Sequence, residues 1–135
     1  RGMMDEAIEA YRKVLELDPE NPKTYINLGI ALRYNEMYDE SLEELYKAIE
    51  IDPISAVAYD EIGSALLKKE KHDEAIAAYK NAVAIDPKFP QPHNNLGVVY
   101  LLKGMTREAS EEFELFQKLE TEKKAEQAKI MGGGH

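Results

Sequence analysis

The amino-acid sequence predicts an all-α solenoid built from antiparallel helix pairs. Three observations predict it: a 34-residue period along most of the 135-residue chain, helical spacing of apolar residues within each period, and glycine and proline at fixed places. A period of this length is typical of stacked helix pairs, in which each unit buries its apolar face against its neighbours. We therefore expect each unit to depend on its neighbours for stability.

The period is clearest at three prolines that each close a similar tripeptide. Pro19, Pro53 and Pro87 lie 34 residues apart, and each follows Leu-Asp or Ile-Asp. The same period separates three glycines, which are Gly29, Gly63 and Gly97. Because several residue types repeat in the same register, the chain contains successive copies of one structural unit.

Each unit is expected to hold a first and a second helix. The first helices are expected at 23–35, 57–69 and 91–103, and the second helices at 4–17, 39–51, 73–85 and 107–128. Aspartate at positions 5, 39 and 73 suits a helix N-cap or first turn. Proline has no amide N–H and restricts the residue before it, so each proline of the period ends a second helix.

These elements divide the chain into repeats. The expected boundaries are 1–21 for a half repeat with a second helix only, 22–55, 56–89 and 90–123 for three full repeats, and 124–135 for a capping helix extension and flexible tail. Because the first unit lacks its first helix, we expect Ala7, Ile8, Tyr11 and Leu15 to be partly uncovered. A piece cut from a longer protein would explain this start, whereas a second protomer or a partner could supply the missing cover.

The glycines of the period lie inside predicted helices, where glycine costs ~1 kcal/mol relative to alanine. Close packing must therefore require them. Each glycine has a small residue twelve positions later, and we expect the two to meet where the helices of one hairpin approach. The expected pairs are Gly29 with Ser41, Gly63 with Ala75, and Gly97 with Ala109.

The residues at these positions resemble the repeat of the tetratricopeptide-repeat family, whose pattern is W-x2-L-G-x2-Y, then A-x3-F, then a closing proline. The unit at 56–89 matches it with Tyr59, Ile62, Gly63, Leu66, Ala75, Tyr79, Ala82 and Pro87. The resemblance covers residues 1–121 and departs from the pattern at Phe116, where alanine is usual, and at Thr121, where proline would stop the helix. We therefore expect the last helix to run on past Thr121.

The resemblance implies a right-handed superhelix whose concave groove is lined by the first helices and binds a protein or peptide. It assigns the following residues to that groove: Lys23, Ile26, Asn27, Ile30, Arg33 and Tyr34 in one unit; Val57, Asp60, Glu61, Ser64, Leu67 and Lys68 in the next; Gln91, Asn94, Asn95, Val98, Leu101 and Leu102 in the last.

Three features of this groove predict what it binds. Asn27 and Asn95 share a register, and an amide that donates and accepts suits a peptide backbone. They resemble the backbone-binding ladder of some peptide-binding superhelices, although Glu61 interrupts it. Asp60 and Glu61 suggest a basic residue near the middle of the ligand. Apolar anchors would meet a stripe made of Ile26, Ile30, Val57, Val98 and Leu101.

Charge and composition argue against several other functions. The formal net charge of −9 opposes binding to nucleic-acid phosphates and to anionic membrane surfaces. The chain has no cysteine, which removes disulfides, thiolate nucleophiles and Cys-based zinc sites. It contains no metal-ligand spacing, no Ser/His/Asp set and no P-loop. We therefore expect no enzyme activity and no cofactor, and we expect a cytoplasmic protein.

The sequence predicts a protein–protein interaction scaffold, and two alternatives remain. One is the repeat region of a larger enzyme, such as a glycosyltransferase, that presents substrate to a catalytic domain. Catalytic sequence beyond this segment in the parent gene would favour that alternative. The other is a self-assembling structural module joined through the uncovered N-terminal helix, which a concentration-independent monomer would exclude.

Overall fold

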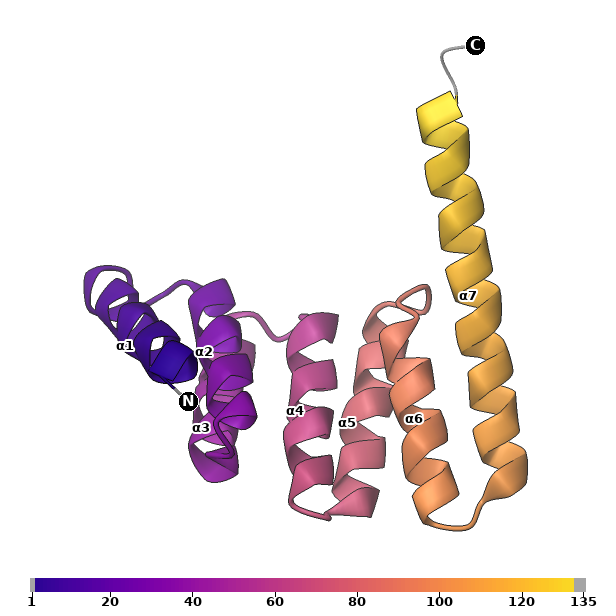
Figure 1. Cartoon of the computed structure of the whole chain (residues 1–135), viewed down its shortest axis with the longest axis horizontal. Coiled ribbons are helices and arrows are strands. Elements are labelled where there is room, and N and C mark those ends of the chain that lie inside the picture. Colours follow the sequence, from indigo (N-terminus) through magenta and orange to yellow (C-terminus); the bar gives the residue numbers. More distant parts are fainter. Residues whose placement is uncertain (1, 133–135) are drawn as a thin grey trace.

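A computed structural model describes residues 2–132, and in that range the chain forms α-helices and no strand (Figure 1). The helices are α1 (Gly2–Leu17), α2 (Pro22–Tyr34), α3 (Tyr38–Ile51), α4 (Ala56–Lys68), α5 (His72–Ile85), α6 (Gln91–Leu102) and α7 (Thr106–Gly132). The prediction of an all-α fold is confirmed. The largest difference from the expected helix ends is in α7, expected to stop at residue 128. Residues 133–135, where a flexible tail was expected, lie outside the described range.

The helices pair as hairpins that stack side by side (Figure 1). Helix α2 packs on α3, α4 on α5 and α6 on α7, while α1 packs on α2. The first helices also touch one another, α2 with α4 and α4 with α6. Within residues 2–132, none of the second helices α1, α3, α5 and α7 touches another second helix. The array therefore curves with α2, α4 and α6 on its inside.

The core runs along the stack of hairpins. Buried apolar residues from α2 to α7 form one cluster, in which Leu45 and Tyr79 are fully covered. A smaller cluster joins Ile8 of α1 to Leu28 and Leu32 of α2. Met3, Val14 and Leu17 of α1 are exposed apolar residues. Ala7, Tyr11 and Leu15 are half-buried as expected, whereas Ile8, also expected to be partly uncovered, is buried against α2. Helix α1 thus covers α2 with one face and has apolar side chains on another.

The helical glycines allow a large side chain, not mainly a small one, to approach. A Cβ atom built at Gly63 would lie 2.6 Å from the ring of Tyr79, and one at Gly97 would lie 2.5 Å from the ring of Phe113. At Gly29 the nearest group is the Leu45 side chain at 2.6 Å. The side chain nearest to each glycine is therefore the one sixteen positions later, while the expected contact with the residue twelve positions later is present at Gly29, where the Ser41 backbone oxygen lies 3.3 Å from the built Cβ atom.

The small residues of the expected pairs still contribute to the hairpin contact. Ser41 Oγ donates a hydrogen bond of 2.6 Å to the backbone oxygen of Gly29. Ala75 and Ala109, at the same register, are buried. The two helices of a hairpin therefore meet through a glycine, a small residue and one large side chain.

The turns inside the hairpins share one backbone geometry that the sequence analysis did not predict. Glu36, Glu70 and Gly104 have φ values of 61°, 60° and 77°, and each follows the C-cap of a first helix. At Glu70, the next residue's N–H donates to Leu66 O and the Glu70 N–H donates to Leu67 O. This pair of bonds is a Schellman motif, which satisfies the last carbonyls of the helix and stops it.

The aspartates near the start of the second helices link neighbouring repeats. They lie in the first turn of α1, α3 and α5, and the N-cap positions of α3 and α5 are Met37 and Lys71. Lys69 donates to Asp39, and Lys103 to Asp73, each across a repeat boundary. The lysine contacts hold the pKa of Asp39 and the pKa of Asp73 below their usual value.

Helix α7 runs well beyond the rest of the array (Figure 1). Thr121 replaces the proline of the earlier repeats, and its hydroxyl donates to the Gln117 backbone oxygen at 2.9 Å, so the helix continues. Phe116 is half-buried, although Ala48 and Ala82 at the same register are fully buried. No helix among residues 2–132 is long and apolar enough to cross a bilayer.

Candidate functional site: the inner face of α2, α4 and α6

The inner face, defined as the solvent-facing side of α2, α4 and α6, carries the residues that the sequence analysis assigned to a groove. Exposed on it are Lys23, Asn27, Tyr34, Val57, Lys68, Gln91, Val98, Leu101 and Leu102. Half-buried are Ile30, Arg33, Glu61, Ser64, Leu67, Asn94 and Asn95. Only Ile26 and Asp60 of the assigned set are buried. The face is therefore mixed, with polar groups at its centre and apolar side chains at both ends.

A pocket of about 310 Å³ lies at the N-terminal ends of α2 and α4. Its lining residues are Pro22, Lys23, Ile26 and Asn27 of α2, Val57 of α4, and Asp52 and Ser55 between α3 and α4. Asn21 caps α2 by accepting from Lys23 N at 3.0 Å, and Ser55 caps α4 by accepting from Ala58 N at 3.1 Å. The pocket walls are thus two capped helix starts that hold their side chains in place.

The pocket brings together four of the assigned residues, Lys23, Ile26, Asn27 and Val57. Sequence reasoning missed Asp52 and Ser55, which lie beside the periodic Pro53. Their place in the repeat, directly before the next first helix, was the signal that could have identified them. The pocket offers an apolar floor, with an ammonium and an amide in its lining.

Two hydrogen-bonded pairs lie on neighbouring residues at the centre of the inner face and are together named the central network: Arg33 with Glu61, and Asn95 with Asp60. Arg33 Nη2 donates to Glu61 Oε1 at 2.8 Å and joins α2 to α4. Asn95 Nδ2 donates to Asp60 Oδ1 at 2.9 Å and joins α4 to α6. The central network therefore links all three first helices.

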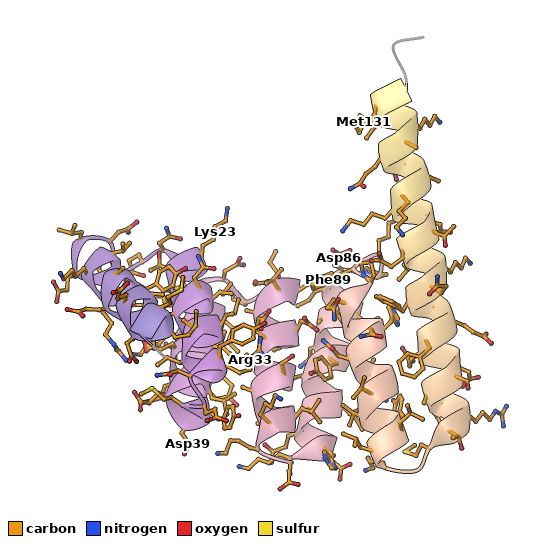
Figure 2. The ribbon with its side chains drawn as sticks, in the orientation of Figure 1. Lys23, Arg33, Asp39, Asp86, Phe89 and Met131 are labelled. Carbon is orange, nitrogen blue, oxygen red and sulfur yellow. The ribbon has the colours of Figure 1, made fainter. Side chains whose placement is uncertain are left out.

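Arg33 is only partly satisfied by these contacts. Its guanidinium carbon lies 4.8 Å from the centre of the Tyr34 ring, a cation–π distance. Figure 2 shows Arg33 between α2 and α4. The Nε atom of Arg33 is buried and has no hydrogen-bond partner among the described residues. A buried donor without an acceptor lowers stability, so this atom has an unused capacity to bind an oxygen.

Asp60 is a buried carboxyl group, 3% exposed. Burial raises its pKa to about 6, against the opposing effect of the Asn95 hydrogen bond. Glu61 raises this pKa further through charge repulsion, and Arg33 lowers it. At neutral pH the inner face therefore holds a buried negative charge whose direct partner is a neutral amide.

These contacts bear on two expectations from the sequence, that Glu61 attracts a basic ligand and that Asn27 and Asn95 act alike. The Glu61 carboxylate already forms an ion pair with Arg33, so it does not lack a cationic partner. The Asn95 amide donates to Asp60, whereas Asn27 is exposed beside the pocket. Ser64 Oγ lies 3.0 Å from the Tyr79 hydroxyl and so contacts the hairpin core. The two asparagines of the expected ladder are thus in different states.

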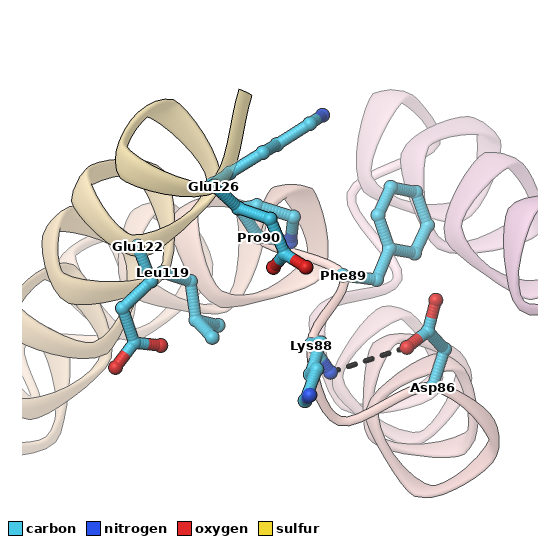
Figure 3. A pocket seen from close by; sticks show the side chains of 8 residues that line it. Asp86, Lys88, Phe89, Pro90, Leu119, Glu122 and Glu126 are labelled. Atoms are coloured by element: carbon cyan, nitrogen blue, oxygen red, sulfur yellow. Dashed lines mark hydrogen bonds between the residues drawn. The ribbon is translucent and has the colours of Figure 1, made fainter. Parts of the chain in front are cut away.

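A second pocket, of about 590 Å³, lies between the α5–α6 connection and the extended part of α7 (Figure 3). Its lining residues are Asp86, Lys88, Phe89, Pro90, Leu119, Glu122, Lys123 and Glu126. Asp86 accepts from Lys88 N at 3.2 Å, which fixes the connection. This pocket was not predicted from the sequence, and it exists because α7 continues past Thr121.

The histidines of the described range lie in different helices, His72 in α5 and His93 in α6. No group of three or more His, Cys, Asp or Glu side chains among residues 2–132 is placed to hold a metal ion. His93 is buried, and its Nδ1 lies 2.7 Å from Glu112 Oε1, which pairs α6 with α7. His72 begins α5. The two histidines therefore lie in separate structural settings.

Comparisons with known proteins agree with this architecture. A family model described as TPR repeat matches residues 1–35 and 63–104, and one described as tetratricopeptide repeat matches residues 22–55. The comparison with curated proteins gave no match.

Solved structures of MamA have a similar fold. A crystal structure of MamA is 31% identical, with a TM-score of 0.81 over 93% of this chain and 72% of that one. The structure of MamA from residue 41 to its end, from Desulfovibrio magneticus RS-1, is 28% identical, with a TM-score of 0.80 over 90% of this chain and 68% of that one. A MamA RS-1 double mutant is 27% identical, with a TM-score of 0.80 over 92% and 70%.

These matches and the curved array of helix pairs support a protein-interaction scaffold. Stacked repeats of this kind form extended concave surfaces that bind other molecules. The matched segments account for more than half of the chain and include every hairpin in whole or in part. The chain belongs to the tetratricopeptide-repeat family.

Proposed function

We propose that the inner face binds a peptide segment of a partner protein, with an apolar side chain seated in the pocket between α2 and α4. The observation that carries this proposal is the pocket itself, since it gathers Lys23, Ile26, Asn27 and Val57 at one place. Pockets with an apolar lining and a few oriented polar groups are typical ligand sites. Asn27 offers a donor and an acceptor to the backbone of such a peptide.

Further apolar side chains lie on the inner face outside the pocket. Ile30 and Leu67 are half-buried, whereas Val98, Leu101 and Leu102 on α6 are exposed. Exposed apolar groups gathered on one face often mark interaction sites. A peptide that extends across α2, α4 and α6 would therefore find apolar contacts at both ends and polar contacts at the central network.

The proposal is tested by selection from a library of random peptides displayed on phage, with the folded chain as bait. Val57→Glu places a charge at the pocket and is expected to reduce binding of the selected peptides roughly tenfold or more. The matched control is Leu115→Glu on α7, because Val57 is 46% and Leu115 is 42% exposed. Circular dichroism and thermal melts confirm that both variants fold.

Two results would overturn groove binding. Selection that enriches no peptide above background would contradict it directly. Equal loss of binding in the Val57→Glu and Leu115→Glu variants would show that the effect does not depend on the inner face. Selected peptides that bind the wild type and the Leu115→Glu variant alike, but not the Val57→Glu variant, support the proposal.

Self-association through α1 is a second candidate, favoured by the apolar side chains that α1 exposes. Met3 and Leu17 are 81% and 89% exposed, and Val14 is also exposed. A second copy that covered this face would bury them. Light scattering over a range of concentrations should then show a species larger than a monomer, which Val14→Glu/Leu17→Glu dissociates. A monomer at every concentration would contradict it.

Two broader proposals follow from the sequence. We place the protein in the cytoplasm, and fractionation of source cells with an antibody to the chain would test this location. A role as the substrate-presenting region of a larger enzyme remains an alternative, and catalytic sequence elsewhere in the parent gene would support it.

A further inference from the structure

The central network has an uneven charge balance. It contains one cation, Arg33, and two carboxyl groups, Asp60 and Glu61, and the cation pairs with Glu61 at 2.8 Å. Asp60 receives one hydrogen bond, from the neutral Asn95 amide. When both carboxyl groups are ionised, the network therefore carries one negative charge that no cation contacts directly. A buried charge is stabilised far better by an opposite charge than by an amide.

The groups that face Asp60 come from each helix packed against it. Helix α4 itself contributes Glu61, which repels the Asp60 charge, and α2 contributes Arg33, which attracts it. The Tyr79 hydroxyl of α5 is near enough for the Asp60 charge to raise the pKa of Tyr79. Helix α6 contributes the Asn95 amide. A cation that approaches Asp60 from the α6 side therefore meets a neutral amide and not the Arg33 cation.

Asn95 is hydrogen-bonded to Asp60 and is the more exposed of the two residues. It is half-buried, and its Oδ1 atom lies 3.5 Å from Nε2 of the exposed Gln91. Because both partners of Asn95 are side chains, rotation of its amide disrupts no backbone hydrogen bond. Such a rotation would open Asp60 to a bound ligand and free the Asn95 amide to pair with that ligand.

Arg33 supplies an independent sign that the network is incomplete. Its Nε atom is buried and lacks an acceptor, although Nη2 of the same side chain is bound to Glu61. A carbonyl oxygen of a peptide is the acceptor that such a donor pairs with most simply. The network therefore lacks one acceptor at Arg33 and one cation at Asp60, and these requirements define the occupant.

We infer that the centre of the inner face selects a lysine or arginine in an extended peptide, whose cation replaces the Asn95 amide at Asp60 while a peptide carbonyl accepts from Arg33 Nε. This inference rests on the proposed function and specifies the ligand. The apolar pocket at Lys23 and Val57 then holds a side chain on one flank of the basic residue. Asp60 is the residue that sets specificity, whereas Glu61 positions Arg33.

Recognition by Asp60 carries a pH dependence. Burial raises the pKa of free Asp60 to about 6, and a bound cation would lower it again. Binding therefore favours the ionised group, and affinity for a basic peptide should fall as pH drops below about 6. By proton linkage the loss between pH 7.5 and pH 5 is about tenfold.

The test begins with peptides selected on the wild-type chain. A selected peptide is synthesised in two versions, one with its basic residue and one with norleucine in that place, which keeps an apolar stem and removes the cation. On the wild type at pH 7.5, calorimetry should show roughly tenfold weaker binding of the norleucine version. On Asp60→Asn the two versions should bind within about threefold of each other, and Asp60→Glu should restore the preference.

Glu50→Gln is the matched control, because Glu50 is an exposed acid on α3, outside the inner face. It should keep the preference of the wild type and its decline toward pH 5. Circular dichroism confirms that each variant folds.

The possible failures are distinguishable. If selection enriches no peptide, both the proposed function and this inference fail. If selected peptides depend on Val57 but show no basic residue, or if Asp60→Asn keeps the preference for the basic version, groove binding stands and recognition by Asp60 is wrong. Equal effects of Asp60→Asn and Glu50→Gln would mean that overall charge attracts the peptide, which also contradicts the inference.

Discussion

At the scale of single residues, Asp60 combines burial with a charge. The carboxyl group is 3% exposed, and its pKa is about 6 instead of the ordinary 3.8. An acid with a raised pKa binds its proton more tightly in the folded state than in the unfolded state. Its contribution to stability is therefore most favourable below pH 3.8 and is lost as pH rises through about 6.

Asp60→Asn should therefore stabilise the fold at high pH. The amide can still accept from Asn95 and carries no charge to bury, so the free energy of unfolding at pH 8 should rise by about 1–3 kcal/mol. At pH 4 the gain should shrink to well below that value. Urea unfolding of the wild type and the variant at both pH values checks this. A variant that is less stable than the wild type at pH 8 would contradict the account of Asp60.

Glu70 has a strained backbone. It is a non-glycine residue with a φ of 60° in the α4–α5 turn. Gly104 occupies the same turn position between α6 and α7 with a φ of 77°. Glycine adopts this region without steric cost, whereas other residues pay about 1–2 kcal/mol. Glu70→Gly should therefore raise the free energy of unfolding by ~0.5–1 kcal/mol.

The reciprocal change, Gly104→Ala, should lower the free energy of unfolding by ~1 kcal/mol. Thermal melts monitored by circular dichroism at 222 nm (the helical signal) measure both variants. Opposite signs are expected for the two substitutions. Two changes of the same sign would show that the turn geometry does not govern stability at these positions.

At the scale of the helices, each hairpin depends on a large side chain of the second helix that packs against a glycine of the first helix. Tyr79 of α5 is fully covered and lies against Gly63 of α4. The Tyr79 hydroxyl contacts Ser64 at 3.0 Å, so the ring is held at two points. Because Tyr79 is fixed, it cannot move aside without loss of packing.

Gly63→Ala should therefore destabilise the α4–α5 hairpin. The new Cβ atom would lie 2.6 Å from the Tyr79 ring, and overpacking of this kind costs ~1–3 kcal/mol, more than the helix propensity gained. Gly2→Ala is the control, because nothing lies within 4 Å of a Cβ atom there. Chemical unfolding measures both. An unchanged midpoint for Gly63→Ala would contradict the hairpin packing.

At the scale of the whole molecule, the 34-residue period was enough to predict most of the fold. It placed the helices because apolar spacing, proline and glycine act locally, within one repeat. It did not place Arg33 against Glu61 or Asn95 against Asp60, because each pair joins helices of different repeats. Which side chains meet there depends on how far one hairpin turns relative to the next, and a single repeat contains no such information.

Two other features were missed because local sequence signals do not define how helices pack against one another. The contact of Gly63 with Tyr79 depends on how the two helices of a hairpin cross, which small residues alone do not define. The pocket beside α7 depends on the length of a helix that carries Thr121 in place of a proline, together with the position of the α5–α6 connection. Local signals predicted the elements, and contacts between elements required the structure.

The central claim is that α2, α4 and α6 form the binding surface, and nuclear magnetic resonance tests it most directly. The chain, labelled with nitrogen-15, would be titrated with a selected peptide, and backbone amide shifts would be mapped on the helices. Shifts confined to α2, α4 and α6, largest near Asn27, Val57 and Asn95, are expected. Shifts concentrated on α3 and α5, or on α7 and the α5–α6 connection, would contradict the claim.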